Sequence, residues 1–312
     1  MVLPMSCERA GWAREMVAGM RRPTALMAAM VVLATIAFDC VVLSAALAAD
    51  QPNQSLPTPV AYKAPVPDWI VTVGLEGRII PAWPGAPTSQ IQPSWAPLFS
   101  VRHAGEPPPY FGPRDSFGFD VINLGQLKIG PAIKYVTERK ASDNPETVGL
   151  GNVGTTIQAG AYADYWPVEW LRLHSEVREG FGGEGGVTGD LFVDAVVPAG
   201  QFRWSAGPRM TLASAAAINP YYGITTAQSI GSVGAGLPQL PVYHAGGGLY
   251  SYGAGTQLEY FINDKWAAHA FVEDEHLADS AANSPLVTQR GSANQWTYGL
   301  GATYSFAMHP LW

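Results

Sequence analysis

The stretch WTYGLGATYSF at residues 296–306 alternates between two kinds of side chain at every position. One set is apolar and has aromatic residues at both ends: Trp296, Tyr298, Leu300, Ala302, Tyr304 and Phe306. The other set is small or polar: Thr297, Gly299, Gly301, Thr303 and Ser305. Because successive side chains of a β-strand leave on opposite faces, this period of two predicts a strand with one apolar face. The length and the aromatic ends also fit a strand that spans an outer membrane.

The same alternation recurs along the chain, each time with one apolar face. Strong segments are 69–79, 127–137, 157–165, 171–178, 190–197, 202–212, 250–260 and 266–275, and weaker ones are 94–103 and 116–123. The intervening segments 139–154, 180–188, 213–247 and 276–293 are expected to be loops or turns, with 213–247 internal or extracellular.

The face opposite the apolar one carries charges of both signs. A charge that faces lipid at the middle of a bilayer costs about 2–4 kcal/mol, so we expect these side chains to face a lumen and to pair across strands. The candidates are Glu76, Arg78, Arg172, Glu176, Arg178, Arg203 and Arg209. Charges of both signs there predict a narrow or plugged interior.

Aromatic residues near the strand ends form a second set of candidates. Tyr and Trp gather at the two membrane interfaces of outer-membrane barrels, so these residues are predicted to form aromatic girdles. They are Trp69, Tyr135, Tyr165, Tyr250, Tyr260, Trp266, Trp296 and Phe306.

Composition decides among the membrane and soluble classes. Charged residues make up 14% of the chain, against about 25% in typical soluble domains. Beyond the N-terminal region there is no second long apolar run, which excludes a helical membrane protein. The sequence therefore predicts an all-β fold, a transmembrane antiparallel up-and-down β-barrel of 10–12 strands. Twelve are favoured because bacterial barrels close with an even number. A soluble β-sandwich with one wet and one dry face is the alternative.

The N-terminal region resembles an export signal. Arg21 and Arg22 precede an apolar stretch at 24–47, and Ala46-Leu47-Ala48 forms a small-x-small cleavage motif. Translation could start at Met1 or at Met20. A retained transmembrane helix is the alternative, since the apolar stretch is long enough to span.

The expected organisation follows. A cleavable signal peptide occupies 1–48, a Pro-rich periplasmic lead-in 49–67, the outer-membrane barrel 68–306 and a C-terminal tail 307–312. Cys7 and Cys40 both lie in the signal segment, so the mature chain would hold no thiol, disulfide or cysteine metal site. The formal net charge of −7 makes nucleic acid an unsuitable partner.

Three patterns that suggest chemistry have plainer interpretations. Residues 149–154, GLGNVG, match a dinucleotide fingerprint by spacing but lack the strand and helix that it needs, so a turn is expected. The acidic cluster at 273–279 lacks calcium-loop spacing. No GxSxG elbow occurs, and His174, His244, His269 and His276 single out no serine partner. We therefore predict no catalytic residue, no cofactor and no metal site.

Five segments of the second half together resemble a known family. They are GPRMTLAS at 207–214, PYYGI at 220–224, GLP at 236–238, DSAANSPLV at 279–287 and GSANQ at 291–295. In this order, followed by the closing strand, they resemble the MipA/OmpV family of Gram-negative outer-membrane proteins. The sequence departs from the family pattern at Ala235, where a serine is usual, and in the order of residues 279–283.

The resemblance implies a scaffold and not an enzyme. MipA-like proteins are associated with murein synthesis, where they bridge a lytic transglycosylase and a penicillin-binding protein, and OmpV-like proteins are described as antigens or adhesins. The expected partners are those two enzymes, outer-membrane lipids and the barrel-assembly machinery. A narrow porin for small solutes and a lipid-modifying outer-membrane enzyme are the alternatives.

Overall fold

The computed structural model describes residues 69–93 and 98–308. The chain divides into two units, Met1–Tyr62 and Lys63–Trp312, and every described residue belongs to the second. The predicted signal peptide, the lead-in and the last four residues of the tail lie outside the described residues.

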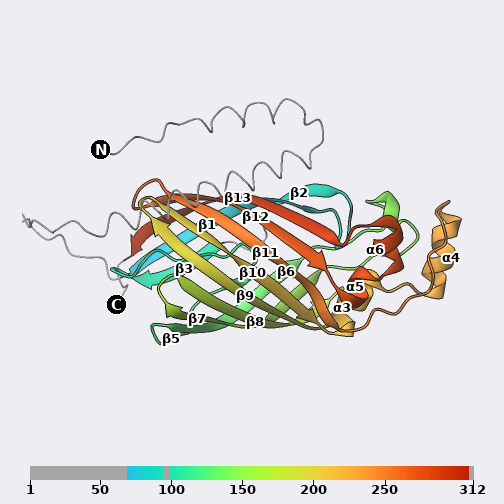
Figure 1. Ribbon diagram of the computed structural model, residues 1–312, viewed down its shortest axis with the longest axis horizontal. Coiled ribbons are helices and arrows are strands. Elements are labelled where there is room, and N and C mark those ends of the chain that lie inside the picture. The colour runs from blue at the N-terminus through green and yellow to red at the C-terminus, as the bar shows by residue number, and fades with distance from the viewer. Residues whose placement is uncertain (1–68, 94–97, 309–312) are drawn as a thin grey trace, which may run out of the picture. The chain divides into compact units, whose positions relative to one another are not determined.

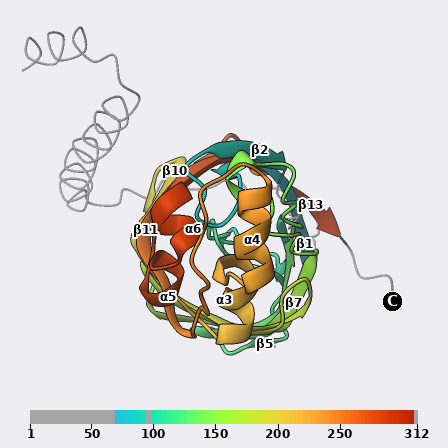
Figure 2. The ribbon, with the colours of Figure 1, turned by 90° about the vertical axis from the view of Figure 1, so that its right-hand side faces the viewer.

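The second unit is one antiparallel sheet that curls into a barrel (Figures 1 and 2). Strands β6 to β13 each pair with the next along the chain, and β13 pairs with β1. The long strands are β1 (Trp69–Pro81), β6 (Leu127–Val136), β7 (Thr156–Val168), β8 (Leu171–Gly182), β9 (Gly186–Ala199), β10 (Phe202–Ala213), β11 (Gly248–Phe261), β12 (Trp266–Leu277) and β13 (Asn294–Met308). The predicted all-β barrel is confirmed, and β13 extends two residues into the predicted tail.

The period of two separates a lipid face from a lumen face. In β1, Leu75 is 74% exposed and Glu76 is 7% exposed, and in β13 Leu300 is 68% exposed while Thr303 is buried. Large apolar side chains on the outside match a bilayer, which does not penalise them. The polar side chains turn inward, where the buried polar groups pair with one another.

Four short strands complete the wall in two half-length pairs. The strands β2 (Ser89–Pro93) and β3 (Leu98–His103) both pair with β1, and β4 (Phe117–Gly118) and β5 (Ile122–Asn123) both pair with β6. The strands β3, β4 and β5 lie within the two weaker segments of the sequence, whereas β2 lies just before the first of them and was not expected. The described wall therefore has eleven strand positions.

The two edges of the sheet meet at a seam without forming a ladder in the described residues. Phe99 of β3 and Phe117 of β4 lie 6.3 Å apart by ring centroid. Nearer the other end, Gln92 Nε2 donates to Thr137 Oγ1 at 3.3 Å. Side chains hold the seam where backbone hydrogen bonds hold the rest of the wall.

Residues 104–116 connect β3 to β4 by running through the barrel, and we call this segment the lumen strap. Its Tyr110 hydroxyl donates to Ser205 Oγ on the inner face of β10 at 2.9 Å. Arg114 Nη2 reaches Thr211 Oγ1 on the same strand at 3.1 Å. The strap forms no strand and lies inside the wall, so the eleven strand positions fall within the predicted range of 10–12 but not on the favoured twelve.

The barrel has two unlike ends. At the turn end, the connections at 169–170, 200–201 and 262–265 are short, and Trp69 pairs with Met308. At the cap end, the connections at 137–155, 214–247 and 278–293 are long. The expected loop at 180–188 is wrong, because β8 and β9 pair as far as Gly180 and Gly186 and leave only 183–185 as their connection.

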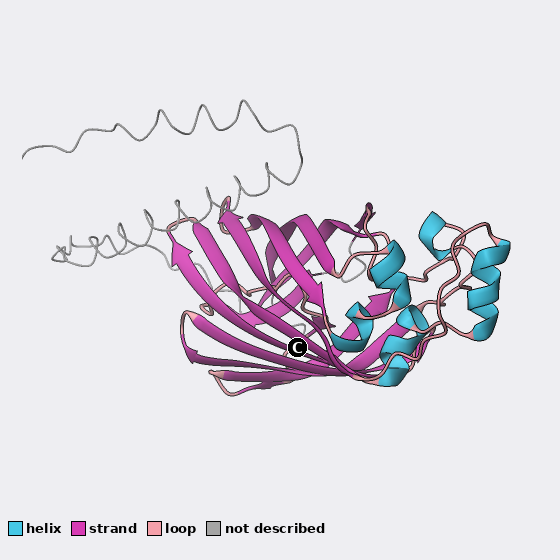
Figure 3. Ribbon diagram, turned by 45° about the vertical axis from the view of Figure 1, so that its right-hand side comes forward, coloured by secondary structure: helices cyan, strands magenta, loops and turns pink. Residues whose placement is uncertain are grey.

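Helices form a cap across one end (Figures 2 and 3). They are α3 (Ala215–Tyr222), α4 (Thr226–Gly234), α5 (Asp279–Ala282) and α6 (Pro285–Arg290), with the short 3₁₀ helix η1 (Pro145–Thr147). Two apolar clusters stabilise this end, one around Tyr222 and Ile218 and one around Trp83 and Leu286. Within the described part of the chain, no helix is long and apolar enough to cross a membrane.

Candidate functional site

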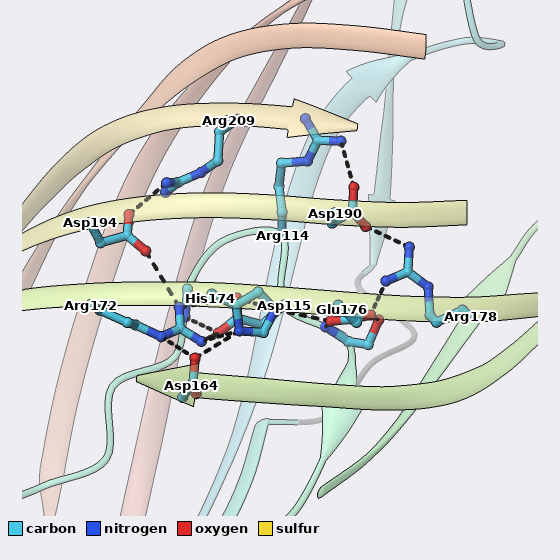
Figure 4. A network of polar contacts seen from close by, with 12 residues as sticks. Arg114, Asp115, Asp164, Arg172, His174, Glu176, Arg178, Asp190, Asp194 and Arg209 are labelled. Carbon is cyan, nitrogen blue, oxygen red and sulfur yellow. Dashed lines mark hydrogen bonds and ion pairs between the residues drawn. The ribbon is translucent and has the colours of Figure 1, made fainter. Parts of the chain in front are cut away.

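The lumen holds a network of buried ion pairs, drawn in Figure 4. Strand β8 supplies Arg172, His174, Glu176 and Arg178 at alternate positions, which places all four on its lumen face. The neighbouring strand β9 places Asp194 opposite Arg172 and Asp190 opposite Glu176. Register alone thus brings opposite charges together.

Arg172 links three carboxylates. Its Nε lies 2.7 Å from Asp164 Oδ1, its Nη2 2.8 Å from Asp115 Oδ2 and its Nη1 3.4 Å from Asp194 Oδ2. Asp194 Oδ1 in turn lies 2.6 Å from Arg209 Nη1 on β10. Arg172, Asp194 and Arg209 are 2%, 0% and 3% exposed, so this part of the lumen is filled with side chains.

A second branch joins the strap to the wall. Arg178 pairs with Glu176, and its Nη2 lies 2.6 Å from Asp190 Oδ2. Arg114 of the strap lies 4.0 Å from Asp190 Oδ1 and 3.3 Å from Glu275 Oε1. The strap is therefore held by charges on β9 and β12 as well as by Arg172 on β8.

The structure places all seven lumen candidates on the inside of the wall. Arg172, Glu176, Arg178 and Arg209 lie in the network just described. Glu76 and Arg78 pair with each other, and Glu76 also lies 2.9 Å from His269 Nε2.

Arg203 lies apart from this network, near the turn end. Its Nε donates to Glu259 Oε2 at 2.7 Å, and its Nη1 donates to the Pro108 carbonyl of the strap at 2.9 Å. It therefore joins the strap to β10 and β11 at a second place.

The strap residues were not anticipated from sequence. Arg114 and Asp115 lie in the segment PPPYFGPRDS at 107–116. This segment has no period of two, so its side chains could not be assigned to a lumen face or a lipid face. Asp190 and Asp194, by contrast, alternate with apolar residues, and that signal could have placed them in the network.

Seven girdle candidates lie on the outside near strand ends. Trp69, Tyr165, Tyr260, Trp266 and Phe306 lie near the turn end, and Tyr135 and Trp296 near the cap end. Tyr250 does not belong to this set. Its hydroxyl lies 2.8 Å from that of Tyr222, and its ring packs against the cap, because the pairing of β10 with β11 shifts register between Thr211 and Leu212.

The small face of the closing strand makes room for larger side chains. A Cβ atom on Gly301 would lie 2.6 Å from His269 Nε2, and one on Gly299 would lie 2.0 Å from the Phe271 ring. Both rings belong to β12 and lie over β13. The small residues at 296–306 are therefore needed to fit the rings of β12 in the lumen, and the apolar residues between them face lipid.

A chamber of about 1020 Å³ lies at the turn end of the lumen, against the strap. Residues 107–112 of the strap, 98–101 of the seam, and Trp166 and Arg203 of the wall line it. We call it the turn-end chamber. Its lining reaches the exposed turns, so it is placed to receive a ligand from that end.

Three histidines of the described residues each lie against a carboxylate or an amide. His174 Nδ1 lies 2.7 Å from Asp164, His269 Nε2 2.9 Å from Glu76 and His276 Nδ1 2.6 Å from Asn294. Among the described residues, no group of three or more histidines, cysteines and carboxylates is placed to hold a metal ion.

The segments that resemble a family lie mainly in the cap. Ser284 Oγ donates to the Tyr222 carbonyl at 2.7 Å, and Gln295 Oε1 accepts from the Gly85 amide at 3.0 Å. The Tyr243 hydroxyl donates to the Ser280 carbonyl at 2.9 Å. These contacts fix loop conformations, which accounts for the motif residues without chemistry.

Comparisons with known proteins find a matching family model and two related outer-membrane proteins. The family model described as "MltA-interacting protein MipA" matches residues 73–306. The outer membrane protein Omp26La of Vibrio anguillarum is 30% identical over 196 residues, which is 60% of this chain and 67% of that protein. OmpV of Vibrio cholerae serotype O1 is 29% identical over 197 residues, again 60% and 67%.

Solved structures with a similar trace are outer-membrane barrels. An outer membrane channel from Pseudomonas putida F1 is 12% identical, with a TM-score of 0.36, and the match covers 80% of this chain and 100% of that one. The KdgM porin is 9% identical, with a TM-score of 0.35, and the match covers 75% and 99%.

Proposed function

The chain belongs to the MipA family and is an outer-membrane β-barrel, and from this premise we propose that it acts as a non-enzymatic interaction protein for enzymes of murein metabolism. The observation that carries the proposal is the filled lumen. A porin needs an aqueous path through the barrel, whereas an interaction protein needs none.

The ion-pair network supports a sealed barrel. Arg172, Arg178 and Arg209 each lie against buried carboxylates at the middle of the lumen. The strap occupies further space at the same level, and the cap lies across one end (Figure 2). These three layers favour the scaffold over the alternative of a narrow porin.

The lengths of the connections support an orientation. Outer-membrane barrels have short periplasmic turns and longer extracellular loops. The turn end would then face the periplasm, where murein lies, and the helical cap would face outward. The exposed side chains at the turn end include Trp170, which is 53% exposed, and Ile262, which is 49% exposed.

The partner class comes from the family description. That description names a protein which interacts with MltA, and MltA is a lytic transglycosylase. We extend the interaction to this chain and expect the enzyme to contact the turn end. A murein synthase of the penicillin-binding class is the second expected partner.

Affinity capture from a solubilised envelope extract tests the partners. The tagged barrel should enrich a lytic transglycosylase over an unrelated barrel of similar size. The variant Trp170→Ala/Ile262→Ser should capture roughly tenfold less, since exposed aromatic and apolar anchors supply much of the affinity of such contacts. The control Ile230→Ser on the cap should capture as much as the wild type. Equal recovery on the unrelated barrel would count against the proposal.

Planar bilayer recording separates the scaffold from the porin. The folded protein should insert without producing conductance steps, because the ion-pair network and the strap fill the lumen beyond the chamber. Stable ohmic steps from protein that shows a folded, heat-modifiable gel band would favour the porin instead.

A further inference from the structure

We propose that the turn-end chamber is a binding site for an uncharged oligosaccharide. The proposal rests on the proposed function, because it takes the chamber to open toward the periplasmic murein, and it adds a ligand to a barrel so far described as contacting only proteins. The argument uses the size of the chamber, its charge state and its aromatic lining.

The volume suits an extended ligand of moderate size. Ligand pockets commonly measure about 300–1,000 Å³, and this chamber of about 1020 Å³ stands at the upper end. The strap closes it toward the middle of the lumen, where Tyr110 and Arg114 bond to β10. The strap thus bounds the chamber on the side of the middle of the lumen.

The charges that line the chamber are already satisfied within the protein. Arg172 pairs with Asp115 and Asp164, and Lys128 Nζ lies 3.1 Å from Asp120 Oδ2. The other charged lining residues, Arg78, His174, Glu176 and Arg203, also have partners, and only Glu169 on the turn has no ion pair in the described residues. An anionic ligand would lose its hydration without gaining a free counter-charge, since each lining arginine and lysine already has a carboxylate partner, and this disfavours an anion.

Aromatic rings give the chamber its remaining character. The rings that face inward come from the strap and the wall: Tyr110, Trp166 and Phe261. Trp166 meets Tyr110 edge to face, with ring centroids 6.3 Å apart and planes at 89°. Tyr110 is further fixed by the guanidinium of Arg172, whose Cζ lies 5.2 Å from the ring centroid.

A sugar is the ligand class that meets both conditions. Its rings present flat C–H faces to aromatic side chains, and its hydroxyls both donate and accept hydrogen bonds while carrying no charge. The paired carboxylates and guanidinium groups can exchange hydrogen bonds with such hydroxyls without losing their ion pairs. Arg203, which already bonds to Glu259 and to the strap carbonyls, lies beside these rings.

Titration of the purified, folded barrel with chitotriose tests the proposal. The wild type should show saturable binding by calorimetry and by tryptophan fluorescence. Trp166→Ala should weaken binding at least about tenfold, whereas Trp166→Phe should retain most of it because an aromatic face remains. Trp170→Ala is the matched control, since Trp170 lies four residues away but outside the chamber lining, and it should bind like the wild type.

Three results would overturn the proposal. They are no binding by heat-modifiable wild-type protein, equal binding by Trp166→Ala, and tighter binding of trigalacturonate or a Pro-rich peptide than of chitotriose. Loss of sugar binding with transglycosylase capture intact would reject the ligand and leave the proposed scaffold standing. Sugar binding without capture would reject the partner and leave the chamber assignment standing.

Discussion

At the scale of single residues, Arg172 connects more of the lumen than any neighbour in Figure 4. It is 2% exposed and reaches carboxylates of the strap, β7 and β9. A buried charge that loses its partner is far more costly than an exposed one, because neither water nor protein then compensates it.

The variant Arg172→Ala should therefore destabilise the folded barrel by about 3–5 kcal/mol. Urea unfolding in lipid vesicles, followed by the heat-modifiable gel shift, measures the change. Lys140→Ala is the control, because the Lys140–Glu138 pair is about half exposed and its loss should leave the midpoint unchanged. An Arg172→Ala midpoint equal to that of the wild type would show that the network contributes little.

Glu184 gives the barrel a pH dependence at the connection between β8 and β9. Burial raises the pKa of Glu184, although the Gln158 amide donates to its Oε1 at 2.6 Å. The folded state then holds this proton more tightly than the unfolded state, so the contribution to stability is full at acid pH and is lost as the pH rises above about 4.3.

We expect Glu184→Gln to gain stability relative to the wild type as the pH rises from 4 to 7. Urea midpoints measured at several pH values give the difference directly. Ile230→Ser, an exposed change at the same end that adds or removes no ionisable group, should show a difference that does not vary with pH. A constant difference for Glu184→Gln would contradict the assignment.

Individual side chains were predictable where the strand pattern was regular. Arg172, Glu176 and Arg178 were placed on the lumen face from their spacing alone, because β8 has no irregularity on its β9 side. Tyr250 was assigned to the wrong side, since a register shift in the neighbouring ladder has no signature in the sequence. The partners Asp115 and Arg114 depend on contacts with residues far along the chain, which no local pattern encodes.

At the scale of elements, the lumen strap is the feature that sets this barrel apart from a plain up-and-down sheet. Its Asp115 accepts from the Gly112 amide at 2.8 Å within the strap and pairs with Arg172 on the wall. Arg114 extends the attachment to β12. Few of its bonds are backbone to backbone, so these side chains hold it.

The variant Arg114→Ala/Asp115→Asn should therefore release the strap without unfolding the wall. Hydrogen exchange of amides in 105–116 should quicken by roughly tenfold or more, while amides of β8 to β11 stay protected. Lys128→Ala, which removes a half-exposed pair near the same end, should leave strap exchange unchanged. Unchanged exchange in the double variant would mean that backbone packing alone fixes the strap.

Elements differed in how well they could be predicted. The long strands follow from alternation, which reports the two environments of a barrel wall directly. The helices of the cap lie in segments expected to be loops, although Thr225 and Gln228 form a capping box that a closer reading of the sequence could have found. The strap had no local signal in the sequence, because its prolines and glycine interrupt both the period of two of a strand and the 3.6-residue period of a helix.

At the scale of the whole molecule, the orientation proposed from loop lengths is directly testable. The natural cysteines are Cys7 and Cys40, so removal of the predicted signal peptide leaves a background without thiols. Ile230 on α4 is 64% exposed, and Trp170 on the opposite end is 53% exposed.

A membrane-impermeant maleimide should label Ile230→Cys on intact cells and should fail to label Trp170→Cys until the outer membrane is disrupted. Both variants should label equally in detergent, which controls for reactivity. If intact cells labelled Trp170→Cys and not Ile230→Cys, the proposed orientation would be reversed. The turn-end chamber would then face the outside of the cell and not the periplasm.

The barrel wall can close only after β1 has paired with β13. Eleven residue pairs, from Trp69 with Met308 to Ile79 with Tyr298, join segments more than 200 residues apart. Contacts this distant in sequence form slowly, because the chain loses the conformational entropy of a long loop before the new contacts contribute any favourable free energy. The edge of β1 that faces β13 must therefore stay unpaired until the last strand has been synthesised and exported, although the other edge can already pair with β2 and β3. A ribosome stalled before residue 294, or a gene truncated there, would remove both ladders of β13, to β1 and to β12, and leave an open sheet whose exposed edges invite aggregation.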